Sequence, residues 1–172
     1  MVYQRDAVEA MPAYVQGKSI PNAVKLSSNE NPYPPLASVL EVVREHAASL
    51  GLYPDMSARE LTERIAQRWD VKAEQVAVGA GSVEVAAQLI NASAGEGDEV
   101  MFAWRSFEAY PILVQVAGAT PVPVPLTADD RHDLEAMLAA VTERTRLIFI
   151  CTPNNPTGSV VTRSEMERFL ER

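Results

Sequence analysis

The second half of the chain alternates between short apolar segments, typical of strands, and amphipathic segments, typical of helices. We expect strands at 76–78, 99–103, 120–125 and 147–151. Every residue of 147–151 is apolar, which is the pattern of a strand covered on both faces. Strands that alternate with helices predict an α/β fold with a mostly parallel sheet, because helices form the crossovers between parallel strands.

Local signals place the helices and the chain segments between them. Prolines predict that 1–35 forms an extended arm, and apolar periodicity predicts a helix from Leu36 that ends at Gly51. Further helices are expected at 83–91, 107–116 and 133–141, and capping boxes at Ser57 with Glu60 and at Thr162 with Glu165. In 120–125 the prolines alternate, which predicts a strand at the edge of the sheet.

Composition excludes several classes of protein. The 172 residues are enough for one domain, and the net charge of −8 argues against a nucleic-acid-binding protein, which needs a basic surface. The single cysteine, Cys151, excludes a disulfide framework and a cysteine-rich zinc site, and we expect no metal site. No apolar run approaches the roughly 18 residues that cross a membrane, and the start lacks a signal-peptide pattern. We therefore expect a cytoplasmic protein that binds no membrane.

Several reactive side chains are expected to play structural parts only. Within its apolar strand, Cys151 should be buried and inert. His46 and His132 lie in or beside helical stretches without partners in sequence, and we expect both at the surface. The acidic pairs Asp98–Glu99 and Asp129–Asp130 are expected in solvated turns.

In a parallel sheet, ligands bind beyond the carboxyl ends of the strands, so the loops that follow the strands are the candidate site. The first, residues 79–82 (Gly-Ala-Gly-Ser), opens a helix and offers free N–H groups to a phosphate. The alternative is a tight turn with Ser82 as a plain N-cap. Glu84 stands where the dinucleotide-binding fingerprint needs a third glycine, and no lysine follows to make a Walker A loop.

The next two loops each allow a functional and a structural interpretation. Three aromatic residues lie close together in the second: Trp104, Phe107 and Tyr110. They could stack on a heteroaromatic cofactor or pack in the core. The third, 152–158, has two asparagines between two prolines, which suits either a fixed hydrogen bond to a ligand oxygen or a structural turn.

Taken together, these loops resemble those of the fold-type I pyridoxal-phosphate aminotransferases, in particular the histidinol-phosphate and aromatic amino acid (phenylalanine) aminotransferases. The matching motifs appear in the family's order, at 11–14, 17–18, 26–32, 53–55, 79–82, 97–100 and 153–158. Residues 81–83, 104–108 and 124–127 look more like the aromatic branch.

The resemblance implies roles for five residues toward the cofactor, pyridoxal 5'-phosphate. Ser82 and Val83 would bind its phosphate, largely through backbone N–H groups. Phe107 would stack on the pyridine ring, and Asn155 would hydrogen-bond the phenolic oxygen. Tyr53 would reach the cofactor phosphate of a neighbouring subunit, which implies a homodimer.

The resemblance also places Tyr14, Glu30 and Asn31 near the substrate. Pro34 stands where the family usually has glycine, and Thr152 where it often has asparagine, so the substrate-side loop at 29–35 could be shaped differently. The implied reaction transfers an amino group from an aromatic amino acid, or histidinol phosphate, to a 2-oxo acid such as 2-oxoglutarate.

The implied chemistry also needs a lysine to carry the cofactor and a carboxylate on the ring nitrogen. In the family both follow the Asn-Pro-Thr-Gly loop. Lys18, Lys25 and Lys72 are the only lysines, and none matches that position. We therefore expect an N-terminal fragment that holds no catalytic residue and is inactive alone.

The resemblance then implies a three-layer sandwich that is incomplete. The expected divisions are an arm at 1–35, a helical part of the small domain at 36–74, and the first half of the large domain at 75–172. Strands encoded further on would separate 76–78 from the other strands. We also expect an exposed apolar edge on the sheet.

Two other functions remain open from the residues alone. One is half of a Rossmann-fold NAD(P)-dependent oxidoreductase. Glu84 weakens it, as does the lack of an acidic strand end about 20 residues later. The other is a truncated, non-catalytic remnant that pairs with another subunit.

Overall fold

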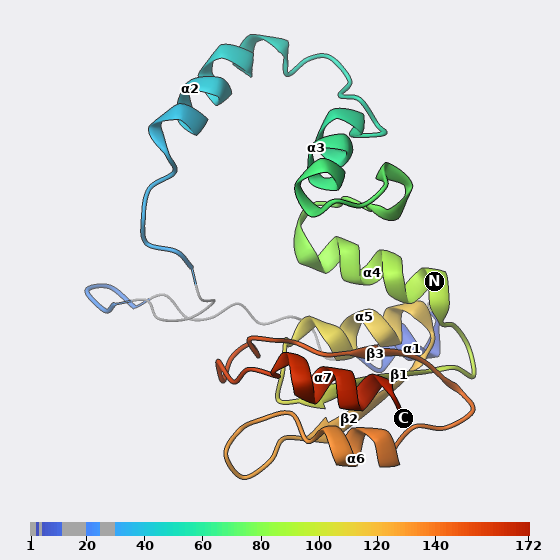
Figure 1. Cartoon of the computed structure of the whole chain (residues 1–172). Helices are drawn as coiled ribbons and strands as arrows, with labels where there is room; N and C mark the ends of the chain where they lie inside the picture. Colours follow the sequence, from blue (N-terminus) through green and yellow to red (C-terminus); the bar gives the residue numbers. More distant parts are fainter. Residues whose placement is uncertain (1–2, 4, 12–19, 25–29) are drawn as a thin grey trace. The chain divides into compact units, whose positions relative to one another are not determined.

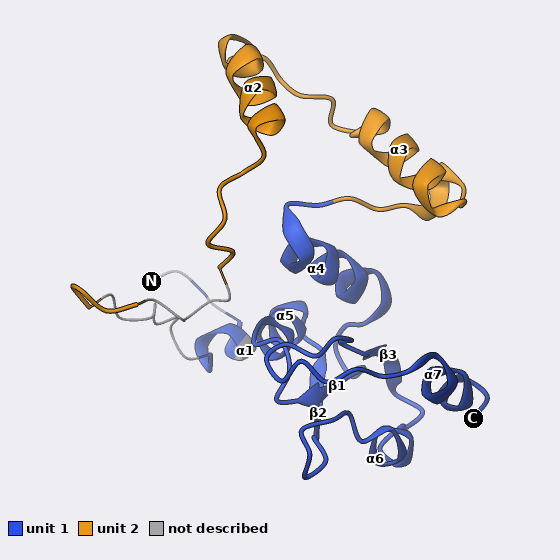
Figure 2. Ribbon diagram, turned by 60° about the vertical axis from the view of Figure 1, so that its left-hand side comes forward, with its two compact units in different colours: residues 1–11, 79–172 blue, residues 12–78 orange. Residues whose placement is uncertain are grey.

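A computed structural model describes the chain except residues 1–2, 4, 12–19 and 25–29. It divides into two compact units, shown in Figure 2: Met1–Met11 with Gly79–Arg172 (unit 1), and Pro12–Val78 (unit 2). Each unit is described by itself. None of the described helices combines the length and the apolar character needed to cross a membrane.

Unit 1 is an α/β layered structure built on a parallel sheet (Figure 1). Its strands lie in the order β2-β1-β3. The strands are β1 (Glu99–Trp104), β2 (Thr120–Pro125) and β3 (Thr145–Phe149). The helices are α1 (Asp6–Glu9), α4 (Gly81–Ser93), α5 (Ala109–Ala117), α6 (Leu134–Ala139) and α7 (Arg163–Leu170).

The central strand β1 separates two apolar cores because its side chains alternate between the faces of the sheet. Val100 and Phe102 pack with Ile90 of α4 and Val114 of α5. Met101 and Ala103 point to the other face, where the core includes Met137 of α6 and Phe169 of α7. Helices therefore cover both faces of the sheet, which gives the three layers that the sequence predicts.

The proline-rich strand β2 lies at the sheet edge, as predicted. The Thr120 N–H donates to the Asp98 carbonyl at 2.8 Å, and the Leu126 N–H donates to the Trp104 carbonyl at 3.1 Å. These even-numbered donors face β1. The alternating prolines fall on the opposite side, where their missing N–H groups break no bond to β1.

Two strand predictions need correction. Residues 76–78 form no strand, because they pair with none of the strands that the structure describes. A strand needs a neighbour for its backbone hydrogen bonds. The strand predicted at 147–151 is β3, which begins and ends two residues earlier and is half-buried rather than covered on both faces. It pairs with β1 and lies at an edge of the described sheet. Its other edge therefore has no neighbouring strand among the described residues.

Unit 2 contains the helices α2 (Ala37–His46) and α3 (Arg59–Trp69), with the short 3₁₀ turns η2 (Ala47–Ser49) and η3 (Ala73–Gln75). The predicted capping box of Ser57 with Glu60 is wrong. The Asp55 carboxylate accepts from the Ser57 N–H, the Ser57 hydroxyl and the Arg59 N–H at 2.7–3.1 Å. Glu60 instead pairs with Arg64 one turn along the helix, at 2.7 Å.

At the ends of the chain, one local prediction fails and one is confirmed. The short helix α1 interrupts the arm that was expected to be extended throughout. The capping box of Thr162 with Glu165 begins α7 as predicted.

Candidate functional site

A pocket of about 350 Å³ opens at the carboxyl ends of β1 and β3, where parallel sheets bind ligands. Its volume falls within the roughly 300–1,000 Å³ of ordinary small-molecule sites. Helices α4 and α5 and the segments after β1 and β3 supply its lining: Ser82, Val85, Ala86, Leu89, Phe107, Tyr110, Phe149, Cys151 and Asn155. The pocket therefore joins all three loops that the sequence singles out.

The first wall is the start of α4, where backbone N–H groups lack helical partners. Gly81 has a φ of +80°, a left-handed conformation that glycine adopts without strain. Ala80 is the N-cap, and its side chain makes no capping hydrogen bond. Ser82 thus lies inside the helix, so the alternative of Ser82 as a plain N-cap is wrong. The side chain of Glu84 accepts the Ala80 N–H.

The second wall is aromatic. The rings of Phe107 and Tyr110 meet edge to face, with centroids 5.5 Å apart. Tyr110 in turn stacks on Phe149. Trp104 packs against Phe102 of the core instead, at 6.1 Å. Phe107 therefore lines the pocket and Trp104 packs in the core, whereas Tyr110 does both, because its ring also lies 5.8 Å from that of Phe102.

The third wall is the turn after β3, which contains two adjacent asparagines with different surroundings. Asn155 lines the pocket. Asn154 is buried, with 2% of its surface exposed, and its side chain hydrogen-bonds Ser106, Arg105 and Thr157. The turn is thus both a structural element and a wall of the pocket.

Two predictions about reactive side chains fail near this pocket. Cys151 is half-buried and lines the pocket rather than being enclosed in a strand, because β3 ends at Phe149. His132 is buried, not at the surface, and its Nε2 accepts the backbone N–H of Cys151 at 3.3 Å. Its Nδ1 has no hydrogen-bond partner in the described structure. His46 is exposed, as predicted.

Burial also shifts the proton affinity of two of these side chains. It raises the pKa of Tyr110 to about 12, with a smaller contribution from neighbouring Cys151. It lowers the pKa of His132, because the imidazolium form loses its hydration. Both side chains are therefore held in their neutral forms near pH 7.

The acidic pair Asp98–Glu99 is not a solvated turn as predicted. Glu99 is buried and accepts hydrogen bonds from Thr142 at 2.6 Å, Arg144 at 2.6 Å and Thr145 at 3.3 Å. The Thr142 hydroxyl is the main cause that lowers the pKa of Glu99, and Arg144 adds to it. Because Glu99 is the first residue of β1, it anchors the amino end of the strand, away from the pocket.

The remaining predicted site residues lie elsewhere in the chain. Val83 follows Ser82 in α4 but does not line the pocket, and its side chain is 44% exposed. In unit 2, Tyr53 is 98% exposed, Glu30 is exposed, and Asn31 accepts the Tyr33 N–H in a local turn. Tyr14 lies outside the described residues. The roles of these five residues stay predictions.

The sequence did not identify every residue of this site. Phe149, the last residue of β3, was assigned to the strand alone, although the end of a strand borders the ligand edge. Ser106 was passed over between Arg105 and Phe107. A buried serine beside a pocket residue leaves no pattern in sequence, and only the structure reveals its partner 48 residues away.

The sequence and the fold of this chain are shared with a known family of enzymes. Residues 21–172 match the family of class I and II aminotransferases, so the chain belongs to that family.

Among curated relatives, the aromatic amino acid aminotransferase of Cutibacterium acnes is 60% identical over 98% of this chain and 48% of its own length. That of Rhodococcus jostii is 54% identical over 97% of this chain and 47% of its own length. The chain thus spans about half the length of these relatives.

Solved structures show the same fold. Histidinol-phosphate aminotransferase from Sinorhizobium meliloti, in complex with pyridoxal-5'-phosphate, superposes with a TM-score of 0.77 at 27% identity, covering 84% of this chain and 39% of that one. A variant of Thermus thermophilus aspartate aminotransferase gives 0.85 at 26% identity, covering 99% of this chain and 47% of that one.

Proposed function

We propose that the protein containing this chain is a pyridoxal-phosphate-dependent aminotransferase, in which this chain forms the amino-terminal half. The amino donor would be an aromatic amino acid, and the acceptor a 2-oxo acid such as 2-oxoglutarate. One observation carries the proposal: Ser82, Phe107 and Asn155, from three separate loops, line one pocket at the strand ends.

The start of α4 fits a phosphate group. The N–H groups of Ser82 and Val83 belong to the first turn of α4, where backbone N–H groups have no partner within the helix, and the helix dipole adds positive potential. Ser82 itself lines the same pocket, and its hydroxyl is a further donor. This combination of donors is the one that proteins use to hold phosphate.

The other two walls fit a substituted pyridine ring. Phe107 offers a flat face for stacking, and Asn155 offers an amide N–H to the phenolic oxygen. When bound, pyridoxal phosphate withdraws electrons from the amino acid Cα and carries the amino group between substrates. The residues of this chain would hold the ring, fix its tilt and place a proton donor at that oxygen.

The lysine that bears the cofactor would come from the rest of the protein. None of the residues that line the pocket is a lysine. Lys18 and Lys25 lie outside the described residues, and Lys72 follows α3 in unit 2. The curated relatives are about twice as long as this chain, which leaves room for that lysine and for a carboxylate partner to the ring nitrogen.

The finer assignments are part of the same proposal. Tyr14, Glu30 and Asn31 would lie near the substrate, and Tyr53 would reach the cofactor phosphate of a second subunit in a homodimer. The aromatic substrate class is supported by the names of the curated relatives. Histidinol phosphate is the competing donor, because a similar solved structure bears that name. The arm, small-domain and large-domain divisions and the cytoplasmic location also remain proposals.

Cofactor binding tests the proposal. The whole protein, made at the length of its relatives, should bind pyridoxal phosphate and develop visible absorption. Phe107→Ala should weaken binding about fivefold, because aromatic stacking is worth about 1 kcal/mol. Ile112→Ala, at an exposed position of α5, is the matched control and should bind normally. A protein that binds NADH instead would be the Rossmann oxidoreductase weighed above.

A second experiment concerns the chain alone. Borohydride treatment of the 172-residue chain with pyridoxal phosphate should leave no stable cofactor adduct on a lysine by mass spectrometry. A stoichiometric adduct would contradict the assignment of the carrier lysine to the other half. Preference of the whole protein for histidinol phosphate over phenylalanine would overturn the proposed substrate.

A further inference from the structure

Two pocket residues are each preceded by a buried polar residue, and these two buried residues bond to each other. Ser106 precedes Phe107, and Asn154 precedes Asn155. The Ser106 hydroxyl donates to Asn154 Oδ1 at 2.7 Å, and both residues are at least 98% buried. The bond therefore ties the loop that presents Phe107 to the loop that presents Asn155.

Asn154 uses all of its polar groups in this connection. Its Nδ2 donates to the Arg105 carbonyl at 3.1 Å and to the Thr157 hydroxyl at 3.0 Å. Its backbone N–H donates to the Ser159 carbonyl at 2.8 Å, and its carbonyl accepts the Gly158 N–H at 2.7 Å. A buried amide with every group paired can adopt few other orientations, because each leaves a polar atom unsatisfied.

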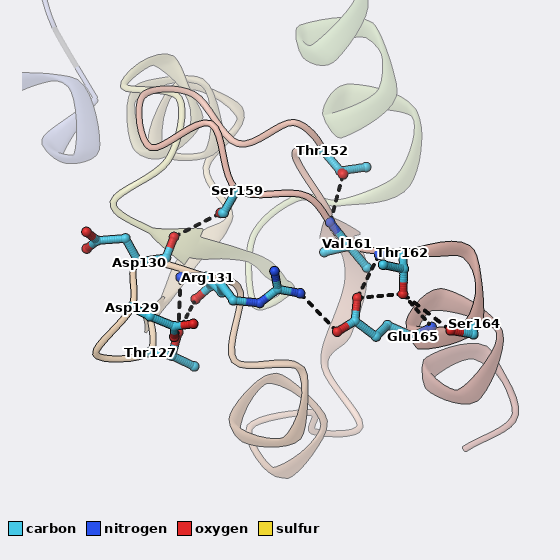
Figure 3. A network of polar contacts seen from close by, with 10 residues as sticks. All are labelled: Thr127, Asp129, Asp130, Arg131, Thr152, Ser159, Val161, Thr162, Ser164 and Glu165. Carbon is cyan, nitrogen blue, oxygen red and sulfur yellow. Dashed lines mark hydrogen bonds and ion pairs between the residues drawn. The ribbon is translucent and has the colours of Figure 1, made fainter.

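The Asn155 turn is also held from its outer side. The hydroxyls of Thr157 and Ser159 both donate to the Asp130 carbonyl, at 3.0 and 2.9 Å. Figure 3 shows the hydrogen bond from Ser159 to Asp130. It also shows the Val161 N–H donating to the Thr152 hydroxyl, a bond of 3.0 Å that closes the base of the turn. The turn thus has its own internal and outer bonds, and the Asn154 side chain joins it to the Phe107 loop.

We propose that Asn154 and Ser106 are positioning residues that set the separation between Phe107 and Asn155 across the pocket. This inference rests on the proposed function, because the separation matters only if a flat cofactor lies between these two side chains. Asn154 does not contact the cofactor in this proposal. It acts through the backbone of both loops, so that ring stacking and the bond to the phenolic oxygen form together.

The unliganded protein gives a readout that needs no activity. In amide hydrogen exchange on the whole protein, Ser106→Ala should speed exchange in 154–159, although the substitution is in the other loop. Asn154→Ala should speed exchange in both 105–108 and 154–159. Exchange in α6 should stay as in the parent protein, because the core contacts of this helix lie on the face of the sheet opposite α4 and α5.

Cofactor affinity and absorption give the second readout. Either substitution leaves a buried polar group without its partner, so we expect about tenfold weaker binding of pyridoxal phosphate. The pH midpoint of the bound cofactor's absorption should also shift, because Asn155 would no longer sit correctly at the phenolic oxygen. The double variant should lose little more than either single variant, since both break one connection.

The matched control is Ser159→Ala, which removes a hydroxyl bond of 2.9 Å from the outer side of the same turn. It should leave the affinity within about twofold and the pH midpoint unchanged. If Asn154→Ala lowers thermal stability but leaves affinity and midpoint as in the parent, the role is merely structural and the inference is overturned. If the parent protein itself binds no pyridoxal phosphate, the proposed function fails, whatever the exchange experiment gives.

Discussion

The ring of Tyr110 lies nearly parallel to the ring of Phe149, with centroids 4.6 Å apart and an interplanar angle of 16°. This stack joins the first turn of α5 to the end of β3 and forms the apolar floor of the pocket. It buries the tyrosine ring and leaves the hydroxyl beside Cys151, a weak hydrogen-bonding partner. The phenol therefore resists ionisation.

Spectrophotometric titration of the chain should show this resistance directly. The pKa of Tyr110 is raised to about 12, so its phenolate absorption should appear later than that of an ordinary tyrosine, near 10. Tyr110→Phe should remove that late step. Tyr33→Phe, at an exposed position, should leave it in place. A late step that survives in Tyr110→Phe would contradict the assignment.

Because His132 is buried, we expect the free energy of unfolding to fall in mild acid. Its pKa is lowered in the folded state by burial, so below the unfolded value of about 6.5 the unfolded chain binds more protons. The free energy of unfolding should therefore be fully retained above that pH and fall as the pH drops toward the folded pKa. Urea titrations between pH 7.5 and pH 5 measure it.

His132→Gln should flatten this part of the pH profile, since the substitution removes the titrating group and keeps an acceptor for the Cys151 N–H. His46→Gln, at an exposed helix position, should keep the parent profile. If the free energy of unfolding of His132→Gln falls with pH as steeply as in the parent protein, other groups cause the pH dependence.

Glu99 should make the sheet sensitive to stronger acid. Its pKa is lowered chiefly by the Thr142 hydroxyl and also by Arg144, so the stability it contributes is present above about pH 4.5 and lost as the pH falls. Glu99→Gln should lower the melting temperature at pH 7 and reduce its dependence on pH below 5. Glu74→Gln, at an exposed ion pair, should change neither. Equal effects of the two substitutions would refute this role of Glu99.

Gly118 should be a glycine at which alanine is costly. It ends α5 with a φ of +85°, and the Ala119 N–H reaches back to the Val114 carbonyl at 3.1 Å. An alanine Cβ there meets Arg5 Nη1 at 3.8 Å, an ordinary contact, but the residue must adopt the left-handed conformation, which costs about 1 kcal/mol. Gly95→Ala, where no atom lies within 4 Å, should cost less. Denaturant unfolding measures both, and equal losses would contradict the account.

The sequence predicted the parts of this fold that depend on local chemistry. Strand and helix alternation, the prolines of β2 and the capping box of α7 depend on neighbours in sequence, and all three are confirmed. The sequence predictions failed where contacts between residues far apart in the chain determine which side chains are buried. His132 bonds to Cys151 in the segment after β3, 19 residues further along the chain, and Glu99 bonds to Thr142 and Arg144, more than 40 residues away.

The candidate site shows the same division. Each loop could be recognised from its own composition, but whether Ser82, Phe107 and Asn155 meet depends on the packing of α4 and α5 against the strand ends. Residues 76–78 look like a strand in sequence because Val76 and Val78 alternate. Alternation does not by itself make a strand, and residues 76–78 do not belong to the sheet of the described strands.

The most direct test of the central proposal is a single half-reaction. The whole protein, loaded with pyridoxal phosphate and freed of excess cofactor, is mixed with phenylalanine and no acceptor, and phenylpyruvate is measured. We predict about one phenylpyruvate per bound cofactor, with conversion of the cofactor to its amine form. A protein that binds the cofactor yet yields no oxo acid from phenylalanine or tyrosine and no keto phosphate from histidinol phosphate would contradict the assignment as an aminotransferase.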